Sequence, residues 1–183
     1  MTGKFTTNVI FAKGAFNEFG YKGGLPWGHY KEDMEHFMTV TSGSVVVMGR
    51  KTFESLPSYL KGRINIVLSG STDVPCCAKD ATVPDRVWNG RELFEDRGIG
   101  AWLRHAACWY EKDVFIIGGA SLIHEAISNG VDYIYLTQFH NQKELPADMY
   151  QSTSLKDYKV VDASECFSKG YKLDVVFEKL VGR

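Results

Sequence analysis

One acidic residue falls among apolar side chains in a segment that the hydrophobic pattern predicts to be a helix. At about 100° per residue, an apolar stripe of this segment, Tyr30–Thr41, is formed by Tyr30, Met34, Phe37, Met38 and Val40. The opposite side carries Lys31, Glu32, Glu35, His36 and Thr39. Asp33 lies inside the apolar stripe, so we expect burial to raise the pKa of its carboxyl unless a partner compensates.

Two interpretations of Asp33 stay open at this point. An acid in the first turn of a helix interacts favourably with the helix dipole, which is a purely structural role. Alternatively, Asp33 is a functional acid in a ligand pocket. Pro26 and Trp27, just upstream, favour the second interpretation, because they give a rigid entry and a large aromatic wall.

Two glycine-bearing segments are each predicted to join a buried strand to a helix. They are Gly49-Arg50-Lys51-Thr52 and Gly118-Gly119-Ala120-Ser121. A helix start presents unpaired N–H groups, and glycine lets a phosphate approach the backbone closely. Arg50 adds a cationic fork suited to a phosphate monoester, and Thr52 adds a hydroxyl donor. One such glycine often only relieves crowding; two together, one with an arginine, predict a pyrophosphate-bridged ligand.

Other nucleotide and hydrolase motifs are absent from the sequence. No G-x-G-x-x-G follows the first predicted strand. The stretch Gly43–Thr52 is one residue too long for a P-loop, and the residues between its glycines, VVVM, are predicted to be a strand. No G-x-S-x-G elbow is present. The sequence therefore excludes the usual Rossmann, NTPase and serine-hydrolase patterns.

Short β-branched runs alternate with helical patterns, which predicts an α/β fold with a mostly parallel, mixed central sheet of eight strands flanked by four helices. We expect strands at Phe5–Lys13, Ser44–Met48, Arg63–Ser69, Val83–Trp88, Asp113–Ile117, Val131–Phe139, Tyr158–Ala163 and Tyr171–Leu180. We expect helices at Tyr30–Thr41, Lys51–Leu56, Gly90–Ala107 and Ala120–Asn129. The last two strands are expected to form an antiparallel hairpin, and Gly14–Gly24 is expected to be a long loop.

The length and composition indicate one domain, residues 1–183. Hydrophobic residues make up 44%, charged residues 23%, and the formal net charge is -1. We therefore expect no general attraction to nucleic acid or to a membrane surface. No signal peptide or spanning apolar run is evident, so we expect a cytoplasmic protein. Cys76, Cys77, Cys108 and Cys166 form no CxxC pair, and the five histidines show no metal-ligand spacing; we expect reduced thiols and no metal.

The ordered motifs resemble the dihydrofolate reductase family over nearly the whole chain. They are Gly24-Leu25-Pro26-Trp27, Asp33, Met48-Gly49-Arg50-Lys51-Thr52, Leu60-Lys61-Gly62-Arg63-Ile64-Asn65, Ile116-Ile117-Gly118-Gly119 and Tyr135-Leu136-Thr137. The GLPWG and TFESLP segments look most like phage-encoded members, for which the location would be the host cytoplasm. The resemblance implies a monomer that transfers hydride from NADPH to carbon 6 of dihydrofolate while nitrogen 5 gains a proton, giving tetrahydrofolate.

The resemblance also implies roles for individual residues. The catalytic set would be Asp33, Trp27 and Thr137, with Asp33 gripping the pterin and Thr137 bracing Asp33. Substrate would contact Ile10, Asp33, Phe37, Leu56, Leu60, Arg63 and Ile116, with Arg63 on the glutamate carboxylate. Cofactor would contact Ala12, Gly20, Leu25, Gly49, Arg50, Lys51, Thr52, Ser69, Gly118, Gly119, Ser121 and Leu122, with Arg50 on the 2′-phosphate. The Gly14–Gly24 loop would be a mobile lid over the nicotinamide.

Three features of the sequence differ from the family pattern or leave alternatives. Gly24 stands where an acid or amide often precedes Leu-Pro-Trp, and Ile123 stands where a tyrosine is usual. Gly70-Ser71 follow the third strand, so preference for NADPH is expected to rest on Arg50. The alternatives are a related pterin or riboflavin-pathway reductase, and a non-catalytic folate- or nucleotide-binding structural module. Arg63 favours a folate substrate, because the other precursors carry no glutamate tail.

Overall fold

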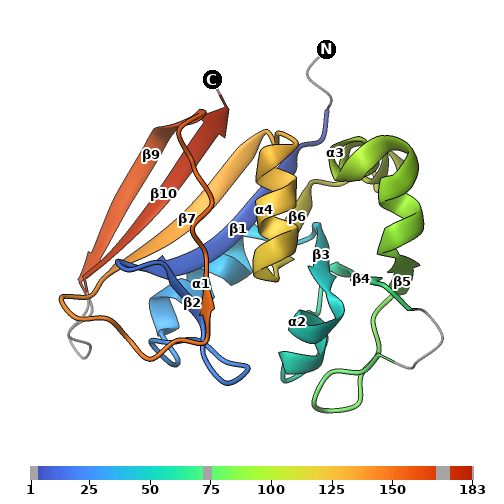
Figure 1. Cartoon of the computed structure of the whole chain (residues 1–183). Coiled ribbons are helices and arrows are strands. Elements are labelled where there is room, and N and C mark those ends of the chain that lie inside the picture. The colour runs from blue at the N-terminus through green and yellow to red at the C-terminus, as the bar shows by residue number, and fades with distance from the viewer. Residues whose placement is uncertain (1–3, 72–75, 168–173, 183) are drawn as a thin grey trace. The chain divides into compact units, whose positions relative to one another are not determined.

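The computed structural model describes residues 4–71, 76–167 and 174–182, and in residues 91–97, 166 and 167 only the backbone. Figure 1 shows the elements in chain order. They are β1 (Thr7–Gly14), β2 (Glu18–Gly20), α1 (Lys31–Val40), β3 (Val45–Gly49), α2 (Arg50–Ser55), β4 (Ile64–Ser69), β5 (Arg86–Asn89), α3 (Gly90–Tyr110), β6 (Val114–Gly118), α4 (Ala120–Ser128), β7 (Tyr133–His140), β8 (Met149–Tyr150), β9 (Tyr158–Phe167) and β10 (Asp174–Gly182). All four expected helices and all eight expected strands are present.

Some boundaries differ from the prediction. β5 begins at Arg86 rather than Val83, and β9 runs to Phe167 rather than Ala163. The first three residues of the predicted last strand, 171–173, lie outside the described part of the chain. α3 contains Gly98 at a φ of 69°, which no residue of a regular helix adopts, so two helical segments meet there.

The sheet is mixed, as predicted. Its eight strands follow the order β5-β4-β3-β6-β1-β7-β10-β9. β4 pairs in parallel with β5 and β3, and β6 pairs in parallel with β3 and β1. β10 is antiparallel to both β7 and β9, which confirms the expected terminal hairpin. The central parallel strands are largely apolar and buried, as strands covered on both faces are, and residues 45–48 of β3 are 0% exposed.

The chain forms two compact units. The first unit comprises residues 1–9 and 41–131, and the second comprises residues 10–40 and 132–183. β1 contributes residues to both. That residues 1–183 act as one domain remains a prediction. No helix in the described residues is long and apolar enough to cross a bilayer.

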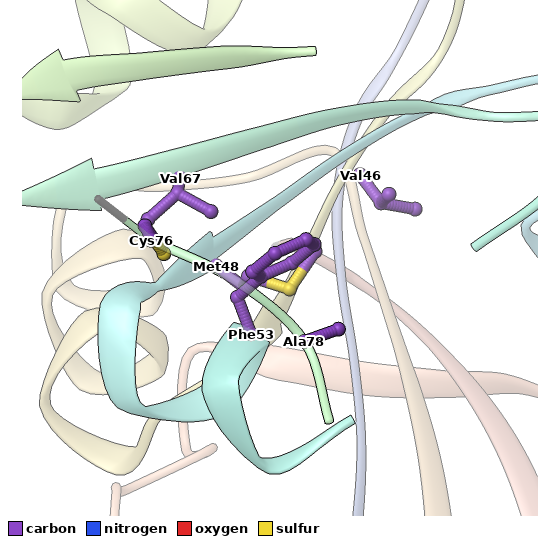
Figure 2. Close-up of a cluster of buried hydrophobic side chains, with 6 residues drawn as sticks. All are labelled: Val46, Met48, Phe53, Val67, Cys76 and Ala78. Carbon is purple, nitrogen blue, oxygen red and sulfur yellow. The ribbon is translucent and has the colours of Figure 1, made fainter. Parts of the chain in front are cut away.

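In the first unit, a core cluster fixes the position of α2. Phe53 of α2 is fully buried against Val46 and Met48 of β3 and Val67 of β4, with Cys76 and Ala78 completing the cluster (Figure 2). Burying an aromatic or large aliphatic side chain contributes about 1.5–3 kcal/mol. This packing therefore holds the short helix, and with it Arg50 and Thr52, at the ends of the parallel strands.

The expectation of an uninterrupted loop over Gly14–Gly24 is wrong. Within it, β2 pairs with β8 as a separate two-stranded sheet. The N–H of Gln151 donates to the carbonyl of Asn17 at 2.8 Å, and the N–H of Asp148 donates to that of Gly20 at 2.9 Å. β8 has two residues and β2 has three, so neither shows a periodic pattern long enough to predict.

Candidate active site

The second unit buries the acid that the sequence singles out. Asp33 lies in the first turn of α1 and is 9% exposed, and Thr137, on β7, is 2% exposed. Burial raises the pKa of the Asp33 carboxyl, and the hydrogen bond donated by the Thr137 hydroxyl lowers it in part. The expected contact between these two side chains is present. It gives a desolvated carboxyl group that is held in place from the neighbouring strand.

The buried face of α1 is rotated relative to the predicted stripe. Met34 and Met38, expected in the core, are 38% and 51% exposed. His36, expected in solvent, is half-buried and stacks on Phe177 of β10, with ring centroids 4.4 Å apart. Burial lowers the pKa of the His36 imidazole. The helix therefore packs through the side that contains Asp33 and His36, because an aromatic ring of the sheet covers that side.

Aromatic stacking fixes the chain that leads into α1. The indole of Trp27 stacks on the ring of Phe139 with centroids 4.2 Å apart, and Tyr30 meets the same ring edge-on at 5.1 Å. Such pairs are worth about 0.5–1.5 kcal/mol beyond the area that they bury. Trp27 Nε1 is buried and has no hydrogen-bond partner among the described residues. It is therefore a donor that a polar ligand atom or a bridging water can use.

Two predicted glycine turns come together in the first unit. A Cβ added at Gly49 would lie 3.8 Å from the backbone nitrogen of Gly119, so the two turns adjoin. A Cβ at Gly118 would lie 3.1 Å from Thr52 Cγ2, and the φ of Gly118 is 151°. The peptide bond Gly118–Gly119 is cis. α4 starts at Ala120, and its N-cap residue Gly119 makes no side-chain cap hydrogen bond. A glycine-capped helix start of this kind suits an anion.

Arg50 does not stand alone at the start of α2. Its Nε donates to Glu54 Oε1 at 2.7 Å, a pair one helical turn apart. A phosphate at this position would compete with the Glu54 carboxylate for the guanidinium. Lys51 is exposed, and the Ser69 hydroxyl, at the end of β4, donates to the carbonyl of Ser71 at 2.6 Å. On α4, Ser121 is exposed whereas Leu122 is buried.

Arg63 is nearly buried and is held by its neighbours. Its Nε donates to Thr41 Oγ1 at 2.8 Å, and Nη1 donates to the carbonyl of Lys61 at 2.9 Å. Burial lowers the pKa of the Arg63 guanidinium. These contacts fix the plane of the fork, which favours bidentate recognition of a carboxylate.

The other predicted site residues are divided between the two units. In the first unit, Ile116 is fully buried in β6, whereas Leu56 and Leu60 are half-buried against the α2 core cluster. In the second unit, Ile10 is buried in β1, Ala12 and Phe37 are half-buried, Gly20 lies in β2 next to Met149, and Leu25 is 40% exposed. Their contacts with ligands remain predictions.

A second buried acid escaped the sequence reasoning. Glu18 of β2 is 0% exposed. Oε1 accepts from Asn141 Nδ2 at 2.7 Å and from the N–H of Leu145 at 2.8 Å, and Oε2 accepts from the N–H of Phe16 at 2.9 Å. Burial alone would raise the pKa of Glu18, but these donors, together with the backbone N–H of Glu18 itself, outweigh burial and hold the pKa below its usual value. The signal in the sequence is weak: a single acid between Phe16 and Phe19 in a segment without periodicity.

The described architecture is that of the predicted class, an α/β protein with a mixed eight-stranded sheet. A model of the dihydrofolate reductase family matches residues 6–181. The dihydrofolate reductase type 9 of Escherichia coli is 33% identical over 160 residues, which cover 84% of this chain and 81% of that protein. The dihydrofolate reductase of Bacillus subtilis (strain 168) is 31% identical over 137 residues, 75% of this chain and 71% of that protein. The chain belongs to the dihydrofolate reductase family.

The comparison with solved structures also finds a similar fold. Dihydrofolate reductase from Enterococcus faecalis, complexed with NADP(H) and RAB-propyl, superposes with a TM-score of 0.78. The match covers 97% of this chain and 96% of that chain at 22% sequence identity. This likeness confirms the predicted fold over nearly the full length.

Proposed function

We propose that the protein catalyses the NADPH-dependent reduction of 7,8-dihydrofolate to tetrahydrofolate. Hydride adds to carbon 6, a proton adds to nitrogen 5, and NADP⁺ leaves. Family membership supports the reaction, and the observation that carries its assignment to this chain is the buried carboxyl of Asp33 braced by Thr137. The two units would act as one domain, since β1 supplies residues to both.

Asp33 has the environment that pterin binding requires. An ionised carboxylate receives two parallel donors well, and a pterin ring presents such a pair in its ring amide and amino group. In a desolvated site this pairing is stronger than in water. Asp33 would therefore orient and polarise the ring, and the unpartnered Trp27 Nε1 would be available as a further donor. The proton would reach nitrogen 5 through water.

The adjoining glycine turns fit the pyrophosphate of a dinucleotide. Bound NADPH supplies the hydride. Gly49, Gly118 and Gly119 would let the phosphates approach the backbone, Thr52 would donate from α2, and the start of α4 would supply N–H groups. Arg50 would bind the 2′-phosphate in exchange for its contact with Glu54. Ala12, Gly20, Leu25, Lys51, Ser69, Ser121 and Leu122 complete the proposed cofactor set.

The primary test is oxidation of NADPH by the purified full chain in the presence of dihydrofolate. We expect turnover, a weaker response with NADH, and a loss of about 10²-fold or more at neutral pH in Asp33→Asn, since removing one positioned polar group commonly costs that much. Glu35→Gln, an exposed acid on the same helix, is the matched control. Full activity in Asp33→Asn would show that the acid is misassigned, and no turnover by the wild type at any pH would refute the proposed reaction.

Arg63 separates folate from substrates without a glutamate tail. Because its guanidinium is already oriented by Thr41 and Lys61, we expect Arg63→Ala to raise KM for dihydrofolate about tenfold or more, the worth of one charge-assisted pair. The same variant should leave KM for a tail-less dihydropterin unchanged. Equal effects on both substrates would favour a different pterin or riboflavin-pathway reductase. Tight binding of folate without turnover would instead favour a structural binding module.

The remaining expectations concern the setting of the enzyme. We propose a cytoplasmic monomer that uses small-molecule partners and binds neither nucleic acid nor membrane. The balanced charge of the chain supports this. The GLPWG segment supports a phage-like origin, in which case the host cytoplasm is the location.

A further inference from the structure

A second concave aromatic site lies at the edge of the sheet in the first unit. A cavity of about 300 Å³ is lined by residues of β5 and of the C-terminal half of α3: Arg86, Trp88, Trp102, His105, Trp109 and Tyr110. Figure 1 shows β5 leading into α3 on this side of the unit. β4 and β3 separate β5 from β6, the strand that carries Gly118. At about 4.8 Å per strand, β5 lies roughly 10 Å from β3, which carries Gly49, and roughly 14 Å from β6. None of the residues that line the cavity belongs to either proposed ligand site.

The three tryptophans that line the cavity differ in exposure. Trp102 is 8% exposed and meets the ring of Trp88 edge-on, with centroids 6.0 Å apart. Trp109 is 73% exposed, and its ring lies 6.1 Å from that of His105. An indole left so open on a helix, which lines the same cavity as the 37% exposed indole of Trp88, is a feature of binding surfaces rather than of a core. The buried Trp102 holds one wall rigid, and the exposed Trp109 offers a face for stacking.

The described charge at this cavity is cationic. Arg86 Nη1 donates to the carbonyl of Asp85 at 2.9 Å, which positions the guanidinium without neutralising it. The carboxylate of Asp85 is occupied elsewhere, because its Oδ2 accepts the N–H of Asn65 at 2.7 Å. Among the residues whose side chains are described, no carboxylate lines the cavity. An anionic group is therefore the complement of Arg86.

We propose that this cavity binds a planar aromatic anion, meaning an aromatic or heteroaromatic ring that carries one carboxylate or phosphate. The ring stacks on the exposed indoles of Trp109 and Trp88, and the anionic group pairs with Arg86. A volume of about 300 Å³ is at the small end of ligand pockets, which fits one ring system with a short substituent. The site is independent of the proposed reductase activity.

The indole N–H resonances of the labelled full chain test the proposal. The sequence has four tryptophans, and the fourth, Trp27, lies in the other unit and serves as an internal control. With NADPH saturating, the protein is titrated with indole-3-acetate, with uncharged 3-methylindole and with cationic tryptamine. We expect shifts at Trp88, Trp102 and Trp109, and about tenfold tighter binding of the anion than of the neutral ring, the worth of one charge-assisted pair.

Two exposed variants and a control complete the test. Arg86→Gln should remove the preference for the anion, and Trp109→Ala should weaken all ring binding, while Arg104→Gln, an exposed arginine of α3 outside the cavity, should change neither. An arm with AMP distinguishes a nucleotide from an aromatic carboxylate, and tighter binding of either supports the site. Absence of shifts at millimolar ligand, shifts confined to Trp27, or an unchanged anion preference in Arg86→Gln would overturn the proposal.

Discussion

Glu18 offers the sharpest test of how the segment 14–24 is held. Its carboxylate is fully buried and receives three hydrogen bonds, from the N–H groups of Phe16 and Leu145 and from Asn141 Nδ2. The bonds from Asn141 and Leu145 join β2 to the chain between β7 and β8. Glu18→Gln keeps the shape of the side chain but replaces one acceptor oxygen with an amide donor. We expect this variant to loosen the segment that the family resemblance assigns as a lid.

The size of the effect follows from the geometry. Each carboxylate oxygen accepts at least one N–H, so the amide nitrogen must face a donor whichever way it turns. At least one hydrogen bond is lost and one buried donor is left unsatisfied, at about 1–3 kcal/mol, while the remaining bonds lose their ionic character. We therefore expect the free energy of unfolding to fall by about 2–4 kcal/mol at neutral pH.

The stabilisation that Glu18 contributes should decrease as the pH is lowered. The folded pKa of Glu18 lies below the ordinary value of 4.5, so the stabilisation is complete above pH 4.5 and is lost as pH falls through the folded pKa. Gln cannot titrate. The difference in unfolding free energy between wild type and Glu18→Gln should therefore be largest at neutral pH and should shrink as the pH falls below 4.5.

Denaturant unfolding at a series of pH values, followed by circular dichroism, measures this difference. Glu35→Gln is the matched control, since Glu35 is exposed and makes a surface pair with Lys31 that is worth little. A loss below about 0.5 kcal/mol at neutral pH, the range of ordinary surface substitutions, would refute the reasoning. So would a difference that stays constant into acid, because it would show that the hydrogen bonds do not depend on the charge of Glu18.

Three further substitutions test the packing of the site. Gly118→Ala should weaken NADPH binding and lower stability by about 1–3 kcal/mol, because the new Cβ meets Thr52 at 3.1 Å; unchanged calorimetric affinity would contradict it. His36→Leu should raise the melting temperature, because His36 Nε2 is buried without a partner among the described residues. The increase should be largest at acidic pH, because the pKa of folded His36 is lowered and the wild type loses stability as the pH decreases from 6.5. A lower melting temperature would show that the stack on Phe177 dominates. Asp33→Asn should stabilise the fold at neutral pH, with the gain vanishing below pH 3.8, because burial raises the folded pKa; a loss that is independent of pH would show a structural acid.

The parts of the fold that the sequence predicts are those with long, regular patterns. Parallel strands such as β3 are continuous apolar runs, and α4 has an amphipathic period, so both are found within a residue or two. β2 and β8 are not predictable in this way, because each is two or three residues long and exists through its pairing with the other. Their pairing depends on where Glu18 finds its donors, and that is a tertiary property.

The sequence predicts only part of the candidate site as well. The burial of Asp33 follows from its place on a helical wheel, but the wheel puts Met34 and Met38 inside and His36 outside, and the structure reverses this. A wheel gives relative directions on a helix, whereas the aromatic ring of Phe177 on the neighbouring sheet decides which direction is covered. Hydropathy also undervalues His36, whose flat ring stacks well on another ring.

The two buried acids of the second unit differ in the number of their hydrogen-bond partners, and this difference, rather than burial, favours Asp33 as the ligand-binding acid. A carboxylate has about four acceptor sites. Glu18 receives three hydrogen bonds from the protein, and its pKa is lowered; it is satisfied and has no need of a ligand. Within the described part of the chain Asp33 receives one, from Thr137, and its pKa is raised because burial outweighs that bond. A desolvated carboxyl with acceptor sites still to fill gains most from a ligand that brings two parallel donors, and the pterin edge is such a ligand. The same comparison predicts that a bound pterin lowers the pKa of Asp33, which titration of the complex against the free protein would detect.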